Sequence, residues 1–149
     1  MNKELYLYSI RLLTRRDYSR HKLKEKLLIR SDDLIEIEDL LDLLEEKKYL
    51  QEKTYARQRI QYWLKAGNSI NNIINKAKQE HLRISKDFIH EISEEIQVNP
   101  EQKLQEIFEK KFAQKLQEAS LEEKEKIKRR AFGYFQRRGF SSSSILELF

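Results

Sequence analysis

The sequence predicts an elongated, all-α protein of about nine helices. The 149 residues include only three glycines and one proline, which favours long helices over hairpin-rich sheets. Hydrophobic residues make up 39% of the chain and charged residues 37%, so there is apolar material for seams between helices but not for one thick core. Apolar side chains recur at helical spacing along the chain.

A basic turn separates the first two predicted helices. Basic residues complement the end of the first helix, and Ser19 is placed to cap the start of the second. The third helix is acidic on its outer face. The inward stripe of the first helix comprises Tyr6, Ile10 and Leu13, and that of the third comprises Leu34, Ile37, Leu40, Leu41 and Leu44.

The next three helices follow the same scheme. Ser69 is placed to cap the fifth helix and Ser85 the sixth. We assign Trp63 to the core, because it lies on the apolar stripe rather than beside the exposed basic residues. The stripe of the fourth helix comprises Ala56, Ile60, Trp63 and Leu64, and that of the sixth comprises Phe88, Ile89, Ile92 and Ile96.

The last three helices begin at Pro100, because proline suits a first helical turn and pushes the preceding residue out of the α region. We expect helices from about Glu101 to Ala119, from Leu121 to Arg138, and from Ser142 to the end. Ser120 and Glu123 have the spacing of a capping box. The nine helices form three groups, which we expect to be three-helix repeats over residues 1–50, 51–99 and 100–149.

The sign of the charge alternates along the chain. Residues 11–30 carry eight positive and two negative side chains, whereas residues 31–52 carry two and nine. Residues 53–90 and 126–149 are basic again, with an acidic block between them. The net charge of +5 indicates an acidic partner, which on this ground alone is a nucleic acid, a protein or a lipid headgroup.

One basic motif recurs in the chain. Arg15-Arg16-Asp17-Tyr18-Ser19 has the layout of Arg137-Arg138-Gly139-Phe140-Ser141, and a weaker copy is Lys65-Ala66-Gly67-Asn68-Ser69. Because the third copy precedes the ninth helix, the register of the last group stays open. The recurrence indicates a contact made several times, although helix-end complementation and solubilising charge remain an alternative. The candidate binding residues are Arg15, Arg16, Lys22, Lys65, Arg129, Arg130, Arg137 and Arg138.

Catalytic and cofactor chemistry is not indicated. The chain has no cysteine, so disulfides, thiolate zinc sites and cysteine nucleophiles are excluded. Its glycines form no phosphate-binding loop, and His21, His81 and His90 lack metal-ligand spacing. We therefore expect no catalytic residue, metal or cofactor, and no enzyme. No stretch approaches the ~18 apolar residues of a membrane span, so we expect a cytoplasmic protein.

The opening of the chain contains the stretch Tyr8-Ser9-Ile10-Arg11-Leu12-Leu13-Thr14-Arg15-Arg16-Asp17-Tyr18-Ser19. This stretch resembles the opening of the RecX family of recombination regulators. The resemblance continues through Tyr55-Ala56-Arg57, and the stretches Lys126-Ile127-Lys128-Arg129-Arg130-Ala131-Phe132 and Arg137-Arg138-Gly139-Phe140 resemble the C-terminal unit of that family.

Four places in the chain depart from the family pattern. Lys48 and His81 stand where the family usually has glycine, so we expect two altered helix boundaries. Gln51-Glu52 replaces two aspartates, and Asn68-Ser69 replaces glycine-proline.

The resemblance implies tandem three-helix repeats in a curved, elongated, solenoid-like monomer. It implies that this molecule binds in the groove of a RecA filament on DNA and mainly inhibits RecA ATPase, filament growth and strand exchange in recombinational repair. Two alternatives stay open. One is a sequence-nonspecific protein that binds single- or double-stranded DNA, and the other is a helical scaffold that recruits proteins through its acidic helices.

Overall fold

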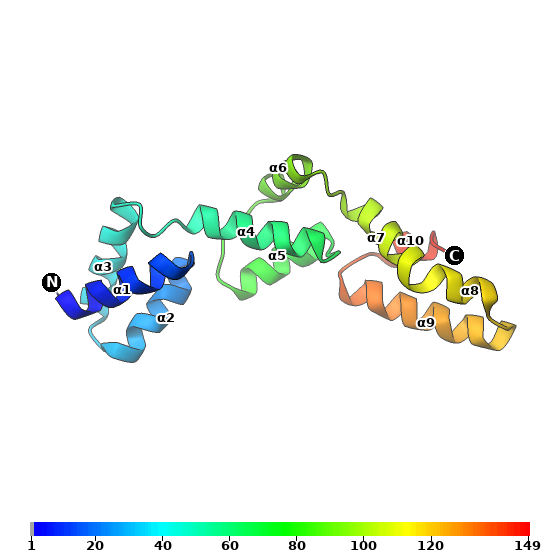
Figure 1. The fold of residues 1–149 in the computed structure, drawn as a ribbon, viewed down its shortest axis with the longest axis horizontal. Coiled ribbons are helices and arrows are strands. Elements are labelled where there is room, and N and C mark those ends of the chain that lie inside the picture. The colour runs from blue at the N-terminus through cyan, green and yellow to red at the C-terminus, as the bar shows by residue number, and fades with distance from the viewer. Residues whose placement is uncertain (1) are drawn as a thin grey trace. The chain divides into compact units, whose positions relative to one another are not determined.

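The computed structural model describes residues 2–149, and this part of the chain is helical without a strand (Figure 1). The helices α7, η1 and α8 follow one another without a break, so the described residues form nine helical stretches. The predicted all-α class is confirmed. The elements are α1 (Lys3–Arg15), α2 (Arg20–Arg30), α3 (Leu34–Glu46), α4 (Glu52–Lys65), α5 (Ile70–Gln79), α6 (Lys86–Ile96), α7 (Pro100–Phe108), the π-helix η1 (Glu109–Ala113), α8 (Gln114–Glu118), α9 (Leu121–Arg137) and α10 (Ser142–Leu146).

The chain divides into two compact units. The first unit runs to Arg59 and includes Lys78–Arg83, and the second unit consists of Ile60–Ala77 and Ile84–Phe149. The three repeats expected at residues 1–50, 51–99 and 100–149, and their curved arrangement, stay predictions.

The core of the first unit lies among α1, α2 and α3. Leu23 and Leu27 of α2 are fully buried, as are three of the leucine and isoleucine residues on the predicted stripe of α3. Leu34 was expected on this stripe, but its side chain is 54% exposed because it is the first residue of α3 and lies at the open end of the buried face. The buried cluster comprises Leu5, Tyr18, Leu23, Leu27, Ile37, Leu40, Leu41, Leu44 and Leu50.

Aromatic side chains fill the C-terminal part of the second unit. The ring of Phe135 is fully buried, and the rings of Phe112 and Phe140 meet it edge-on. Trp63 is 4% exposed, which confirms its assignment to the core. The buried cluster around Phe135 comprises Leu104, Phe108, Phe112, Ala131, Phe135, Phe140 and Ile145.

Most helix starts match the predictions. Ser85 accepts from the amide of Phe88, and Ser120 and Glu123 form the capping box. Pro100 is the first residue of α7. The helix expected from Glu101 to Ala119 contains the π-helical turn η1, which the apolar pattern did not reveal.

Two helix ends correct an expectation. Lys48 and His81 have φ angles of 63° and 58°, so both occupy the left-handed region that favours glycine. The boundaries after α3 and α5 therefore keep a glycine-like conformation, with a lysine and a histidine in it, instead of being altered.

Candidate functional site

Each of the three basic turns ends in a serine cap. Ser19, Ser69 and Ser141 each accept a hydrogen bond of 3.1 Å from the backbone amide three residues later. This confirms that the three serines are equivalent. The cap satisfies one amide at each helix start and thereby fixes the basic residues before it relative to the helix that follows.

The second and third turns have the same backbone, whereas the first does not. Gly67 and Gly139 have φ angles of 89° and 87°, and the next amide in each turn donates to the carbonyl five residues earlier. This is the left-handed helix ending for which glycine is favoured. In the first turn Arg16 is extended instead, with φ −164°, and Asp17 does not adopt a positive φ.

The second and third turns also bind each other within the second unit. The amide of Ser69 donates to the carbonyl of Arg138 at 2.9 Å, and the Ser69 hydroxyl donates to the carbonyl of Gly139 at 2.9 Å. In return, Nε of Arg138 donates to the carbonyl of Ala66 at 3.2 Å. We call this pair of turns, residues 65–69 and 137–141, the paired turns. A proline at position 69 could not donate this backbone hydrogen bond to Arg138, because proline has no N–H group.

Arg138 therefore differs from the other candidate residues. Its guanidinium lies 3.9 Å from the centroid of the Tyr134 ring, in addition to its bond to Ala66. A cation held over an aromatic face and bound to a carbonyl has a structural role in the fold. Arg138 is partly buried, whereas Arg137 beside it is exposed.

The first turn opens onto a basic groove in the first unit. This groove has a volume of about 340 Å³ and is lined by Arg16, Tyr18, Lys22, Glu25, Lys26 and Ile29. The guanidinium of Arg16 lies 4.8 Å from the centroid of the buried Tyr18 ring, and Arg15 is exposed at the end of α1. Three cations against one carboxylate make the groove attractive to phosphate or carboxylate groups.

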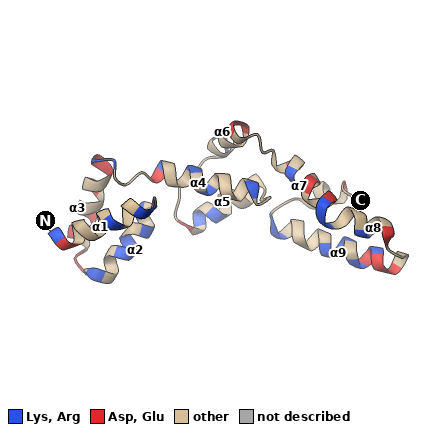
Figure 2. Cartoon of the chain, viewed as in Figure 1, with Lys and Arg blue, Asp and Glu red and all other residues tan. Residues whose placement is uncertain are grey.

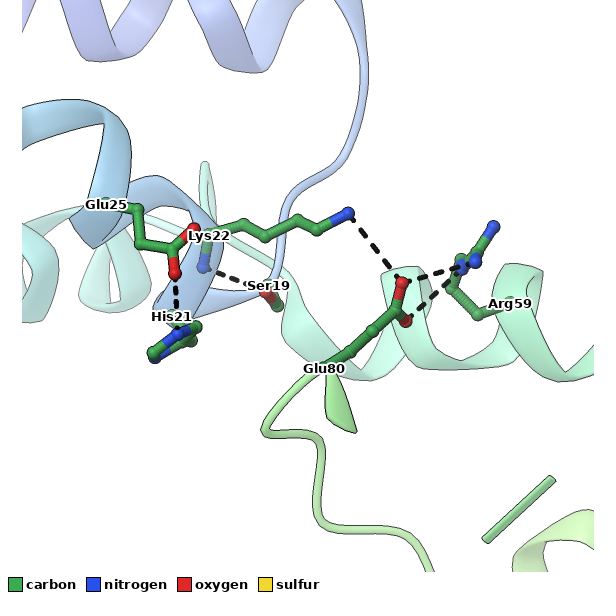
Figure 3. Close-up of polar contacts among 6 residues, drawn as sticks. All are labelled: Ser19, His21, Lys22, Glu25, Arg59 and Glu80. Atoms are coloured by element: carbon green, nitrogen blue, oxygen red, sulfur yellow. Dashed lines mark hydrogen bonds and ion pairs between the residues drawn. The ribbon is translucent and has the colours of Figure 1, made fainter. Parts of the chain in front are cut away.

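A carboxylate from another part of the first unit partly neutralises the positive charge of Lys22 (Figure 3). Nζ of Lys22 lies 3.7 Å from Oε1 of Glu80, and Nε and Nη2 of Arg59 donate to the same carboxylate at 3.3 and 3.2 Å. We call this contact the Glu80 bridge. The Glu80 side chain is only 18% exposed, so the pairing is partly shielded from solvent.

Two histidines stack beside the Glu80 bridge. The ring centroids of His21 and His81 are 3.8 Å apart, and Nε2 of His21 lies 2.9 Å from Oε1 of Glu25. Figure 3 shows His21, Glu25 and Lys22 on the same helix, α2. In the sequence these histidines lack metal-ligand spacing, and nothing in it indicates that the rings of His21 and His81 stack.

Part of the acidic face of α3 is used inside the first unit. The Arg20 guanidinium lies 2.7, 2.8 and 3.1 Å from carboxylate oxygens of Glu38, Asp42 and Glu45, respectively. Burial alone would lower the pKa of Arg20, but these three hydrogen bonds outweigh it and raise the pKa. Hydrogen bonds from Lys24 and then Arg20 hold the pKa of Glu38 below its ordinary value. The sequence did not single out Arg20.

Four of the six basic residues of α9 are exposed. Figure 2 shows acidic residues at the beginning of this helix and basic residues further along it. Lys126, Arg130 and Arg137 are exposed and lie four and seven residues apart, which places them on one side of α9. We call these three residues the α9 stripe. Arg129 and, at the end of α4, Lys65 are also exposed.

The described residues form neither a candidate membrane span nor a group of side chains suited to a metal ion. Over residues 2–149, no helix is long and apolar enough to cross a bilayer. In the same part of the chain, no group of three or more histidine, aspartate or glutamate side chains is arranged to hold a metal ion.

Comparison of the structure with solved structures identifies its fold as RecX-like. The chain is similar to the protein in the crystal structure of RecX from Lactobacillus salivarius, with a TM-score of 0.72 and 15% sequence identity. The alignment covers 97% of this chain and 92% of that chain, so the shared fold extends over almost the full length of both. The sequence itself matches no protein-family model and no curated protein.

Proposed function

We propose that this protein is a RecX-type regulator that binds RecA nucleoprotein filaments in the cytoplasm. On this proposal it mainly inhibits RecA ATPase, filament growth and strand exchange during recombinational DNA repair. The observation that carries the proposal is the RecX-like fold over 97% of the chain. Exposed cations at successive helix ends support it, because a filament presents the same acidic features at regular intervals.

The candidate binding residues differ in their exposure to solvent. Arg15, Arg16, Lys65 and Arg137 are exposed, as are Arg129 and Arg130 on α9. We propose that these six residues contact acidic RecA surfaces or DNA phosphates. Lys22 is paired with the carboxylate of Glu80, and Arg138 is bound to the carbonyl of Ala66. Both residues therefore contribute less to binding of an acidic partner. Several weak contacts made by one chain raise the overall affinity well above that of any single contact.

The test is to add the protein to RecA bound to single-stranded DNA and to follow ATP hydrolysis. We expect suppression that increases with dose and saturates. Hydrolysis that stays unchanged at a large excess of the protein would contradict the proposal. RecA free of DNA should be assayed in parallel, so that an effect on the filament is distinguished from an effect on the enzyme alone.

Sequence-nonspecific DNA binding is the second candidate function, and the basic groove favours it. Arg16, Lys22 and Lys26 gather around one depression, as expected for phosphate contacts. Fluorescence anisotropy with bare DNA separates the two readings. Tight binding that falls steeply with salt would favour this function, whereas suppression of RecA ATPase without tight binding to bare DNA would favour the filament regulator.

The scaffold alternative loses part of its support in the first unit. It uses the acidic face of α3 for partners, and three carboxylates of that face, Glu38, Asp42 and Glu45, bind Arg20 within the unit. Lys24 binds Glu38 as well.

A further inference from the structure

The first unit carries a second groove, and this one is apolar. It has a volume of about 410 Å³ and lies between α1 and the turn that follows α3. None of its residues lines the basic groove. The lining residues are Tyr6, Leu7, Ile10, Leu13, Thr14, Lys48 and Tyr49.

The groove leaves large apolar side chains open to solvent. Leu7 is 59% exposed and Tyr49 is 48% exposed. The Thr14 hydroxyl donates to the carbonyl of Ile10 at 2.7 Å, so this polar group of the lining is already satisfied. Because a soluble protein gains by covering contiguous apolar surface, such a groove is typical of a binding site.

The rim of the apolar groove is cationic. Lys48 is part of the lining, and Nζ of Lys47 lies 5.5 Å from the centroid of the Tyr6 ring. Lys3 and the exposed Glu4 both lie about one turn before Leu7 on α1, so their charges offset each other there. Lys47 and Lys48 are exposed, and neither forms an ion pair with another residue described by the structure. No carboxylate lines the groove.

We propose that the apolar groove binds a short acidic amphipathic helix of a partner protein. Apolar side chains of that helix would cover Leu7 and Ile10, and its carboxylates would pair with Lys47 and Lys48. The lining of α1 runs from Tyr6 to Thr14, about 12 Å of helix, so two to three turns of a partner helix match it.

Two other kinds of ligand fit the lining of the apolar groove poorly. A nucleic-acid backbone needs polar and charged partners along its length, and the groove offers an apolar floor. A peptide that binds by adding a β-strand needs an open strand edge to pair with, and the described part of the chain has no strand. A helix needs only apolar contact and complementary charge.

The test uses a fluorescein-labelled peptide of 14 residues with leucines at positions i, i+3, i+4 and i+7 and glutamates on the remaining helix surface. An isomer of the same composition, with its leucines distributed around the helix, serves as the peptide control. Fluorescence anisotropy measures the binding of both to the full chain. We expect the amphipathic peptide to bind at least tenfold more tightly than its isomer.

Three variants locate the contact. Leu7→Asp should weaken peptide binding at least tenfold, and Lys48→Glu should weaken it three- to tenfold. Leu121→Asp is the matched control, because Leu121 is 84% exposed in the second unit and lies outside this groove. It should change binding less than twofold. Lys48 is exposed, so Lys48→Glu keeps the test informative if Leu7→Asp does not fold.

Three results would overturn the proposal. The first is equal binding of both peptides, and the second is binding that all three variants leave unchanged. The third is a dimer of the wild-type chain in sedimentation experiments that Leu7→Asp alone dissociates. That outcome would mean that a second copy of this chain covers the groove.

Discussion

The hydroxyl of Ser69 donates a hydrogen bond of 2.9 Å to the carbonyl of Gly139, 70 residues later. The same hydroxyl caps α5 by accepting from the amide of Asn72. One side chain therefore fixes the start of a helix and holds two distant turns together. The space around Gly139 is correspondingly small, since an added Cβ would meet the Ser69 hydroxyl and lie 2.5 Å from Cβ of Asn72.

Gly139→Ala should destabilise the second unit by about 2–5 kcal/mol. The left-handed backbone costs an alanine ~1–2 kcal/mol, and the clash with Ser69 and Asn72 adds ~1–3 kcal/mol. Urea unfolding followed by circular dichroism measures the difference. Gly133→Ala is the matched control within α9. Its Cβ meets only the Arg137 side chain at 3.4 Å, and it should be neutral or stabilising by up to ~1 kcal/mol. Similar unfolding of both variants would contradict the tight fit at Gly139.

Lys48→Gly should stabilise the protein by about 1 kcal/mol. Lys48 has a positive φ, and glycine removes the strain that a Cβ causes there. Lys47→Gly is the control in the same turn. Lys47 has φ −78°, so glycine brings no relief and should lower the free energy of unfolding by up to ~1 kcal/mol. If Lys48→Gly lost as much stability as Lys47→Gly, the backbone at Lys48 would not be strained.

The first unit should lose stability in acid through Glu38. Its pKa in the folded protein is lowered from the ordinary value of 4.5 by Lys24 and then Arg20. The contribution of Glu38 is thus present above pH 4.5 and is lost as the pH falls through the lowered pKa. Glu38→Gln should be less stable than the wild type at pH 7, and the gap should close in strong acid. Urea midpoints at several pH values test this, and a gap independent of pH would contradict it. Glu38 is 40% exposed, so solvent screens part of the effect.

Breaking the Glu80 bridge should strengthen binding to an acidic partner. Glu80→Gln releases the charge of Lys22 next to the basic groove. Half-maximal suppression of RecA ATPase should then need about two- to fivefold less protein, as expected for a partly exposed ion pair of ~0.4–1 kcal/mol. Glu91→Gln removes an exposed carboxylate elsewhere and should change nothing. An increase in the required concentration would instead assign the bridge a structural role in filament binding.

Charge reversal on the α9 stripe tests the repeated basic surface. Arg130→Glu/Arg137→Glu should weaken suppression of RecA ATPase by about tenfold, which corresponds to ~1.4 kcal/mol, without lowering the unfolding midpoint. Lys86→Glu/Lys110→Glu, a pair of exposed lysines in the second unit outside the candidate set, is the charge-matched control. If both double variants weakened suppression of RecA ATPase equally, the basic residues of α9 would act only through the net charge of the protein.

Arg138 is excluded from that double variant because its loss should harm the fold. Its bond to Ala66 and its contact with Tyr134 are internal to the second unit. Arg138→Glu should therefore lower the unfolding midpoint, whereas Arg137→Glu should leave it unchanged. Urea unfolding of the two single variants measures this difference. Equal unfolding midpoints would contradict a structural role of Arg138.

The local features of the fold were predictable from the sequence. Serine caps and the boundary at Pro100 depend on residues within one helical turn of each other, so the sequence contains their whole cause. The buried stripe of α3 followed from helical periodicity, apart from Leu34 at its end. The turn η1 was missed, because a π-helical turn shifts the periodicity by a single residue that the apolar pattern tolerates.

The tertiary features of the candidate site were not predictable in this way. Arg138 occupies the same place in the repeated motif as Arg16, yet one binds Ala66 across the second unit and the other lines a groove in the first unit. Glu80 lies 58 residues from Lys22, since it belongs to a turn that packs in the first unit. Pairings of this kind depend on which helix ends meet in space, and a repeat in the sequence does not specify that.

The paired turns also have a consequence for synthesis on the ribosome. Residues 65–69 emerge well before residues 137–141, so a growing chain has the start of α5 exposed while its backbone partners are still to be translated. The amide of Ser69 and the carbonyl of Ala66 then depend on water until Arg138 and Gly139 arrive. Truncation before Arg138 should accordingly loosen a helix start near the middle of the protein as well as remove its last helix.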